Sequence, residues 1–311
     1  MWCFLEQNMA EFKLTTPVAL LIFNRPETTE KVFAEIAKIK PTRLLVVADG
    51  PRQGRIGEYE QCQKTRDIIN RVDWSCEVST NFADVNMGCK ARVASGINWI
   101  FEQVNEAIIL EDDCLPEQSF FRFCQEMLER YKDDPRVGMV SGGNLQAGRR
   151  RGKGDYYFSR YTHIWGWATW RRAWQYYDPD IKLWPQFKSD GWIEKFFDTK
   201  GEQHYWRQSF DWVYSGELDT WDCSWTFTAM TQRFLQIVPN VNLISNIGFG
   251  AEATHTHIVS EHANLPTQPL HFPLIHPDFV LPHLDADLFI SREQIAPSFF
   301  KRQLRKLRKL I

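Results

Sequence analysis

The sequence predicts an α/β protein with a mainly parallel central sheet flanked by helices, and two observations support this. From Thr16 to about Val140, short apolar runs of strand length alternate with amphipathic helical segments. Strands that alternate with helices pair in parallel through right-handed crossovers. Several apolar runs also stop abruptly on polar side chains. In open α/β sheets the ligand crevice lies beyond such strand ends, so we expect a doubly wound layout with a site at one sheet edge.

The expected elements follow one another without long gaps. In chain order they are a strand over Val18–Phe23, a helix over Glu27–Lys38, a strand over Leu44–Ala48, a helix over Glu58–Arg71, a strand over Glu77–Thr80, a helix over Gly88–Gln103 and a strand over Ala107–Leu110. Asn24 and Arg25 follow the first strand, and Asp49 follows the second. We expect these side chains at the same edge, because parallel strands end together.

Three consecutive carboxylates, Glu111, Asp112 and Asp113, follow the last of these strands. They would repel one another unless a cation were present, and hard oxygen ligands suit Mg²⁺ or Mn²⁺. The alternative is a solvated acidic turn capping a helix that begins near Pro116, since acidic side chains favour a helix N-terminus. Set beside the polar ends of the other strands, the triplet favours a site for a nucleotide diphosphate.

The composition limits the classes of partner. With 37 basic and 39 acidic residues, the chain is near neutral, so no bulk attraction to nucleic acid is expected. The seven cysteines are scattered without zinc-type spacing, as is typical of reduced thiols in a cytoplasmic protein. Residues 1–13 lack the pattern of a signal peptide, and no apolar run is long enough to span a bilayer. We expect a cytoplasmic protein.

Beyond Val140 the composition of the sequence changes. Ten of the thirteen tryptophans lie between Trp165 and Trp225. Prolines then crowd residues 266–297, which predicts an extended segment wrapping the surface. Residues 298–311 carry six basic side chains and an apolar stripe at helical spacing. This pattern predicts a basic amphipathic helix on an anionic membrane surface, at the inner face of the membrane; the alternative is a helix packed on its own domain or on a partner subunit.

No glycine-rich phosphate loop follows the first strand, so a diphosphate would be held by side chains and a metal ion. With these features the chain resembles the GT-A nucleotide-sugar glycosyltransferases, close to the N-acetylglucosaminyltransferase I-like group and its bacterial relatives. The resemblance covers about residues 16–257. Its motifs are Asn24-Arg25-Pro26, Ala48-Asp49-Gly50-Pro51, residues 86–90 (Asn-Met-Gly-Cys-Lys), Glu111-Asp112-Asp113, residues 163–170 (His-Ile-Trp-Gly-Trp-Ala-Thr-Trp), Trp221-Asp222 and the segment from Ile247 through His255.

The resemblance implies a Rossmann-like GT-A domain over residues 14–265. Residues 14–140 would form its nucleotide-sugar-binding half and residues 141–265 its Trp-rich acceptor half. The residues expected to bind the nucleotide sugar are Asn24, Arg25, Asp49, Lys90, Glu111, Asp112, Gly166 and Trp167. Among these, Gly166 would let the backbone approach the donor sugar. Trp192 or Trp206 would line the acceptor site, while most other tryptophans are expected in the core.

The resemblance also implies roles in catalysis. Asp113 would ligate the Mn²⁺ or Mg²⁺ that bridges the diphosphate, and His255 would be a second metal ligand, the alternative being a surface histidine. Asp222 would be the general base that takes the acceptor's proton, with Asp219 as the fallback because Cys223 stands where the family has a second acid. The alternative for Asp222 is the N-cap of a helix over Ser224–Met230.

Together these features predict a metal-dependent, inverting glycosyltransferase. It would move a hexosyl or N-acetylhexosaminyl group from a UDP-linked donor to a glycan or lipid-linked acceptor, in the synthesis of surface polysaccharide or glycoconjugate. A non-catalytic carbohydrate-binding protein is one alternative, although it would need no acid cluster at a strand end. A Mg²⁺-dependent phosphohydrolase is the other, although such enzymes carry a nucleophilic acid after the first strand, where this chain has Asn24 and Arg25.

Overall fold

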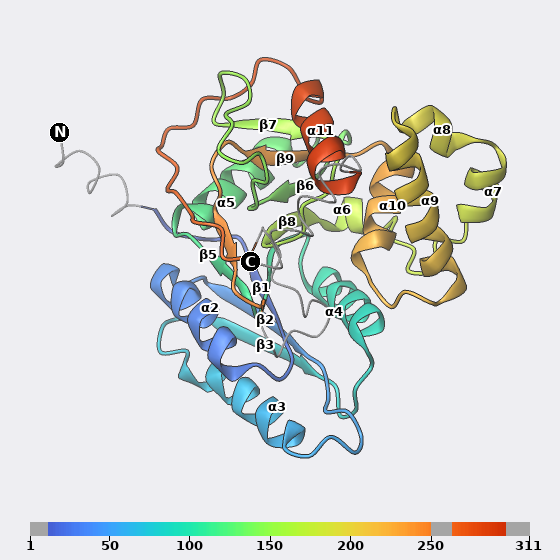
Figure 1. The fold of residues 1–311 in the computed structure, drawn as a ribbon. Helices are drawn as coiled ribbons and strands as arrows, with labels where there is room; N and C mark the ends of the chain where they lie inside the picture. The colour runs from blue at the N-terminus through green and yellow to red at the C-terminus, as the bar shows by residue number, and fades with distance from the viewer. Residues whose placement is uncertain (1–11, 250–262, 297–311) are drawn as a thin grey trace, which may run out of the picture.

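The computed structural model describes residues 12–249 and 263–296. It contains an eight-stranded sheet in the order β3-β2-β1-β4-β8-β6-β9-β7 and a two-stranded sheet of β10 and β5 (Figure 1). The strands are β1 (Val18–Ile22), β2 (Arg43–Ala48), β3 (Glu77–Phe82), β4 (Glu106–Glu111), β5 (Cys114–Pro116), β6 (Val137–Ser141), β7 (Tyr156–Ser159), β8 (Trp167–Trp170), β9 (Leu235–Pro239) and β10 (Ile244–Asn246). The predicted mixed α/β fold with helices on both faces of the sheet is confirmed.

The first half of the sheet is parallel, and the second half is mixed. β1 pairs in parallel with β2 and β4, and β2 with β3. β8 is antiparallel to both of its neighbours, β4 and β6, while β9 is parallel to β6 and antiparallel to β7. β8 therefore runs against both of its neighbours, immediately beside β4, the strand that leads into the acidic triplet.

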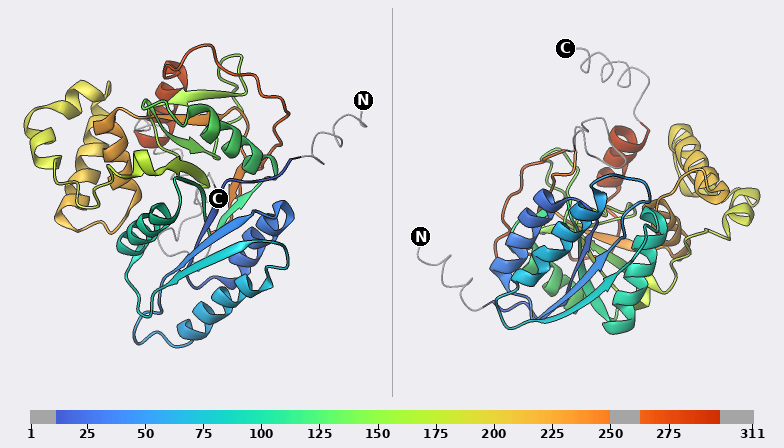
Figure 2. Two further views of the ribbon diagram at one scale, coloured as in Figure 1. Left: turned by 180° about the vertical axis from the view of Figure 1, so that it is seen from behind. Right: turned by 90° about the horizontal axis from the view of Figure 1, so that it is seen from below.

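Helices cover the two faces of the sheet with separate apolar clusters. The helices are α2 (Pro26–Ile39), α3 (Glu58–Asp67), α4 (Cys89–Gln103), α5 (Ser119–Tyr131), α6 (Arg171–Trp174), α7 (Trp184–Ser189), α8 (Trp192–Phe196), α9 (Lys200–Ser215), α10 (Asp222–Gln232) and α11 (Leu284–Ile290), with short turns η1 (Ile68–Arg71) and η2 (Ser291–Ile295). α2 and α5 bury their apolar sides on one face, and α4 and α10 bury theirs on the other. Figure 2 shows these layers from behind and from below.

The predicted elements of the first half agree with the structure to within two residues, apart from two differences. The expected helix over Glu58–Arg71 is α3 followed by the 3₁₀ turn η1. The helix expected near Pro116 begins only at Ser119, because the intervening residues form β5 and pair with β10. A three-residue strand whose partner lies more than a hundred residues away leaves no periodic signal in the sequence.

α7, α8, α9 and α10 gather to one side of the sheet around an aromatic core (Figure 1). Trp184 is 1% exposed and packs edge-on against Phe210 at a ring distance of 5.3 Å. Trp206 stacks on the same ring at 5.3 Å and is 8% exposed. Most of the tryptophans in this half are thus core residues, as expected.

The proline-rich segment ends in α11, which a buried polar network fastens to the rest of the fold. Asp287, 1% exposed, accepts a hydrogen bond from Ser159 Oγ at 2.6 Å and one from Arg160 Nε at 3.2 Å. Ser291 Oγ donates to Glu202 Oε2 on α9 at 2.7 Å. Burial raises the pKa of Asp287, although Ser159 and Arg160 oppose the shift. α11 is therefore hydrogen-bonded to β7, and η2, which directly follows it, is hydrogen-bonded to α9.

None of the helices in residues 12–249 and 263–296 combines the length and apolar character needed to cross a bilayer. The predicted basic helix over residues 298–311 lies outside the described residues, as does His255.

Candidate active site

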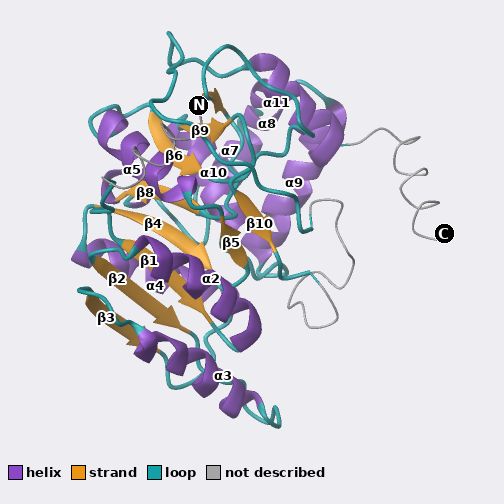
Figure 3. Ribbon diagram, turned by 90° about the vertical axis from the view of Figure 1, so that its left-hand side faces the viewer, coloured by secondary structure: helices purple, strands orange, loops and turns teal. Residues whose placement is uncertain are grey.

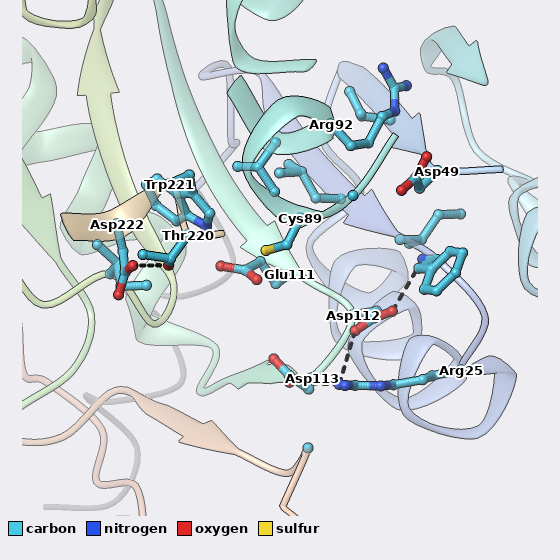
Figure 4. A pocket seen from close by; sticks show the side chains of 18 of the residues that line it. Arg25, Asp49, Cys89, Arg92, Glu111, Asp112, Asp113, Thr220, Trp221 and Asp222 are labelled. Carbon is cyan, nitrogen blue, oxygen red and sulfur yellow. Dashed lines mark hydrogen bonds and ion pairs between the residues drawn. The ribbon is translucent and has the colours of Figure 1, made fainter. Parts of the chain in front are cut away.

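The carboxyl ends of β1, β2 and β4 meet the segments that precede β8 and α10 around a cavity of about 510 Å³. Figure 3 shows the strands of the first half running toward a common edge, and Figure 4 shows the cavity. Six carboxylates and three guanidinium groups line it: Asp49, Glu111, Asp112, Asp113, Asp219 and Asp222, and Arg25, Arg52 and Arg92. Acidic residues that lie far apart in the sequence thus meet in one cavity.

The acidic triplet ends a strand and does not cap a helix. Glu111 is the last residue of β4, and the chain turns at Asp112 and Asp113 directly into β5. α5 begins later, at Ser119, and the carboxylate that accepts the Ser119 amide at its first turn is Glu117, at 2.7 Å, not a member of the triplet. The helix-cap alternative is therefore wrong, because the acids face the cavity instead.

Among the described residues, Arg25 is the cation that forms ion pairs with the triplet. Its Nη1 lies 2.9 Å from Asp113 Oδ2 and 3.7 Å from Asp112 Oδ1. Burial lowers the pKa of Arg25, but the charges of Asp112 and Asp113 outweigh it and raise the pKa overall. Burial, reinforced by Asp113, raises the pKa of Asp112 to about 7, and burial raises the pKa of Glu111 well above its usual range. Because one guanidinium faces three carboxyls, a bound cation would relieve the repulsion.

Asp113 has surroundings that fit a metal-ligating carboxylate. A Cβ on Gly248 would lie 2.0 Å from Asp113 Oδ2, so only glycine leaves room for the carboxylate. Asn246 Nδ2 lies 3.5 Å from Asp113 Oδ1, and the Ile247 amide donates to the Asp113 carbonyl at 2.8 Å. Carboxylate oxygens suit Mn²⁺ or Mg²⁺. The described residues contain no cluster of three or more His, Cys, Asp or Glu side chains that could hold a metal ion by themselves.

Asp49 joins two loops at the edge of the cavity. Its Oδ1 accepts hydrogen bonds from the amides of Gly50 at 2.8 Å and Met87 at 2.9 Å, and its Oδ2 accepts one from Asn86 Nδ2 at 2.9 Å. Burial raises the pKa of Asp49, although the bond from Met87 opposes the shift. A Cβ on Gly50 would lie 2.4 Å from the Val85 backbone. These contacts hold the loops after β2 and β3 together.

Arg92, which the sequence did not reveal as a site residue, supports the same edge from α4. Arg92 is 6% exposed, and its guanidinium donates to the Ala48 carbonyl at 3.0 Å and to Asn81 Oδ1 at 2.9 Å. An arginine within a helical segment carries no sequence signal of this kind. Arg92 thus satisfies backbone and side-chain acceptors where β2 and β3 end.

Asp222 reaches the cavity from the second half. It is the first residue of α10, whose N-cap is Trp221, so the structure does not make Asp222 the cap. Its Oδ1 accepts hydrogen bonds from Thr220 Oγ1 and from the Cys223 amide at 2.9 Å. Its Oδ2 accepts none from the described residues. In Figure 4 the Glu111 carboxyl lies between Cys89 and the Thr220–Asp222 pair.

Asp219, from the segment before α10, lies next to the N-terminal end of α4. Its Oδ2 would be 3.1 Å from a Cβ placed on Gly88, the N-cap of that helix. Beside it, burial raises the pKa of Cys89 to about 12, so this thiol stays protonated at neutral pH. The six cysteines of the described residues are all free thiols.

Four of the predicted donor-binding residues do not line the cavity. Asn24 Nδ2 donates to Glu58 Oε1 at 3.0 Å, and Lys90 Nζ lies 3.5 Å from Asp180 Oδ1. Trp167 is 1% exposed and stacks on Trp221 at 5.6 Å. Gly166, at φ +58°, packs where a Cβ would lie 2.4 Å from Ile244 Cδ1, so this glycine serves packing instead of approach to a sugar.

The tryptophans expected at the acceptor site lie elsewhere. Trp206 is buried, and Trp192 is 47% exposed but does not line the cavity. Instead, Trp165, which is among the tryptophans expected in the core, and Phe249 form part of the cavity wall. Only their positions within the motifs around residues 163–170 and 247–255 offered a signal.

No protein-family model matches this chain, and no curated protein sequence matches it. Among solved structures, the fold is similar to a crystal structure of UDP-glucose pyrophosphorylase complexed with UDP-glucose. The two align with 9% sequence identity and a TM-score of 0.34, over 72% of this chain and 90% of that chain. A likeness at this level says nothing about activity or ligand.

Proposed function

We propose that this protein is a metal-dependent, inverting glycosyltransferase that uses a UDP-linked sugar and a hydroxyl acceptor. The observation that carries the proposal is the single cavity shared by Glu111, Asp112 and Asp113 from the first half and Asp222 from the second. The three carboxylates of the first half suit a cation and a diphosphate. Asp222 offers its Oδ2, which accepts no hydrogen bond from the described residues, for proton transfer.

In this reaction the acceptor oxygen attacks the anomeric carbon of the donor sugar. The bond from that carbon to the diphosphate breaks, and the diphosphate leaves with the electron pair. Asp222 Oδ2 takes the acceptor proton, because Oδ1 is already occupied by Thr220 and Cys223. Arg25 contributes positive charge beside the triplet. A Mn²⁺ or Mg²⁺ ion held by Asp113 would act as a Lewis acid toward the leaving diphosphate.

The site favours transfer over the two alternatives. A phosphohydrolase would place a nucleophilic acid at the end of β1, whereas Asn24 bonds to Glu58 and Arg25 pairs with Asp113. A carbohydrate-binding protein gains nothing from six carboxylates in one cavity, since burying uncompensated charge is costly. A role at the membrane for residues 298–311, and a metal-ligating role for His255, stay predictions.

The test is a thermal-shift panel of nucleotide sugars with and without Mn²⁺, followed by an assay of UDP release. A ligand that binds the native state raises its stability by RT ln(1 + [L]/Kd), so a UDP-sugar should raise Tm only with Mn²⁺ present. If no nucleotide sugar shifts Tm while free glycans do, the carbohydrate-binding alternative is correct. Release of inorganic phosphate from phosphomonoesters would favour the phosphohydrolase.

A further inference from the structure

One tryptophan differs from the other nine between residues 165 and 225. Seven are at most 8% exposed, and two, Trp192 and Trp212, are exposed but lie outside the cavity. Trp165 is half-buried and lines the cavity. The ring packs partly against the apolar core, and its indole N–H donates no hydrogen bond to the described residues, so a donor on a partly exposed ring is left for a ligand.

The antiparallel direction of β8 places Trp165 beside the acidic triplet. β8 runs antiparallel to β4 with Ile109 opposite Trp167, so the residues before β8 lie alongside the end of β4, where Glu111 stands. Gly166 makes the turn at φ +58°, packed against Ile244 and Leu110. Since a side chain at residue 166 would clash, glycine is required at this turn, directly next to Trp165.

Contacts of the segment before β8 lead toward both the proposed base and the proposed metal ligand. On one side, the hydroxyls of Thr162 and Thr226 are hydrogen-bonded at 2.7 Å. The Thr226 hydroxyl also donates to the main-chain carbonyl of Asp222 at 3.1 Å. On the other side, Trp165 meets Phe249 edge to face at a ring distance of 5.7 Å. Phe249 follows Gly248, which abuts the Asp113 carboxylate.

We propose that Trp165, in edge-to-face contact with Phe249, is the platform on which a pyranose ring of the acceptor stacks. The proposal rests on the proposed function and narrows its acceptor to a glycoside. The C–H face of a pyranose is apolar and suits an aromatic face, while a ring hydroxyl can accept from the indole N–H. A second hydroxyl of the same ring then forms the bond to the anomeric carbon, the diphosphate leaves with the electron pair, and the proton passes to Asp222.

The experiment measures UDP release with the nucleotide sugar found in the thermal-shift panel, in Mn²⁺, with methyl pyranosides of glucose, galactose, mannose and N-acetylglucosamine as acceptor probes. At least one glycoside should raise the rate saturably above donor hydrolysis. Trp165→Ala should raise the KM for that glycoside about tenfold, since an aromatic contact contributes up to ~1.5 kcal/mol beyond buried area. The KM for the donor should change less than twofold. Phe249→Ala should have a smaller effect in the same direction.

Trp192→Ala is the matched control, because this tryptophan lies outside the cavity on α8 and should leave both KM values unchanged. If Trp165→Ala does not fold, Trp165→Leu keeps apolar volume without the aromatic face. An unchanged glycoside KM in the variant that folds, a rise in the donor KM instead, or no stimulation by any pyranoside would overturn the proposal while the transferase function stood. If no nucleotide sugar binds at all, the proposed function fails first.

Discussion

The two halves of the sheet position acidic side chains in different ways. In the first half, Asp49 and Glu111 sit at the ends of parallel strands, where backbone pairing fixes them. In the second half, Asp222 stands on a loop-to-helix junction, fixed by stacked tryptophans and by the Thr220 hydroxyl. Regular strands place the first group, and side-chain packing places the second.

This difference separates two tasks. A diphosphate and its cation need several charges at fixed spacing, and strand ends provide such spacing. A general base needs one carboxylate oxygen aimed at one proton, and a packed aromatic layer can aim it. Substitutions in the first half should therefore affect donor binding, and those in the second should affect turnover. The predictions below test that division.

The largest effect is expected for Asp113→Ala. Mn²⁺-dependent UDP binding should be lost while the fold is kept, because the Asp113 carboxylate is the group that Gly248 accommodates and Arg25 pairs. Calorimetry with UDP and Mn²⁺, together with the thermal melt, measures both properties. Asp198→Ala removes a largely exposed acid and is the control. Unchanged UDP affinity in Mn²⁺ would contradict the metal assignment.

For Asp222→Asn we expect donor affinity within twofold of wild type and transfer slowed by at least ~100-fold, the usual loss for a general base. Titration with UDP-sugar and initial rates of UDP release give the two numbers. Asp219→Asn, measured in parallel, should be far milder. If the two variants exchange these behaviours, Asp219 is the base.

A smaller loss is expected for Thr220→Val. The hydroxyl donates to Asp222 Oδ1 and leaves Oδ2 facing the cavity, and a hydrogen bond to a charged group contributes about 1.5–3 kcal/mol, so kcat should fall at least ~10-fold. Donor KM should stay unchanged, and Thr220→Ser should restore the rate. Thr231→Val, whose hydroxyl bonds only backbone carbonyls of α10, is the control. Equal losses in the two variants would mean that only helix packing had changed.

Much of the first half could be predicted, because its strands and helices are long enough for their periodicity to appear in the sequence. Val18–Ile22 and Cys89–Gln103 are examples. The strand ends then brought Arg25, Asp49 and the acidic triplet together as expected. The local sequence pattern was enough to predict the site edge there, because strands that alternate with helices pair in parallel and so end at the same edge of the sheet.

The second half depends on contacts that no local pattern contains. Trp165 meets Phe249 across more than eighty residues, and β5 exists only because β10 pairs with it. The motif around Gly166 predicts that Trp167 binds the donor and that Trp165 lies in the core. In the structure Trp167 lies in the core and Trp165 lines the cavity. A glycine marks a special turn without showing which neighbour faces the ligand.

The network around α11 has a practical consequence for shortened forms of this protein. A truncation after residue 265, the end of the predicted transferase domain, would remove Asp287 and Ser291. The buried Ser159 and Glu202 would each lose one hydrogen-bond partner, and the partly exposed Arg160 would lose its ion pair with Asp287. Losing the partner of a buried polar group costs ~1–3 kcal/mol. Anyone trimming the chain for expression should therefore keep it at least through Ile295, since a cut at the predicted domain boundary would yield a less stable protein.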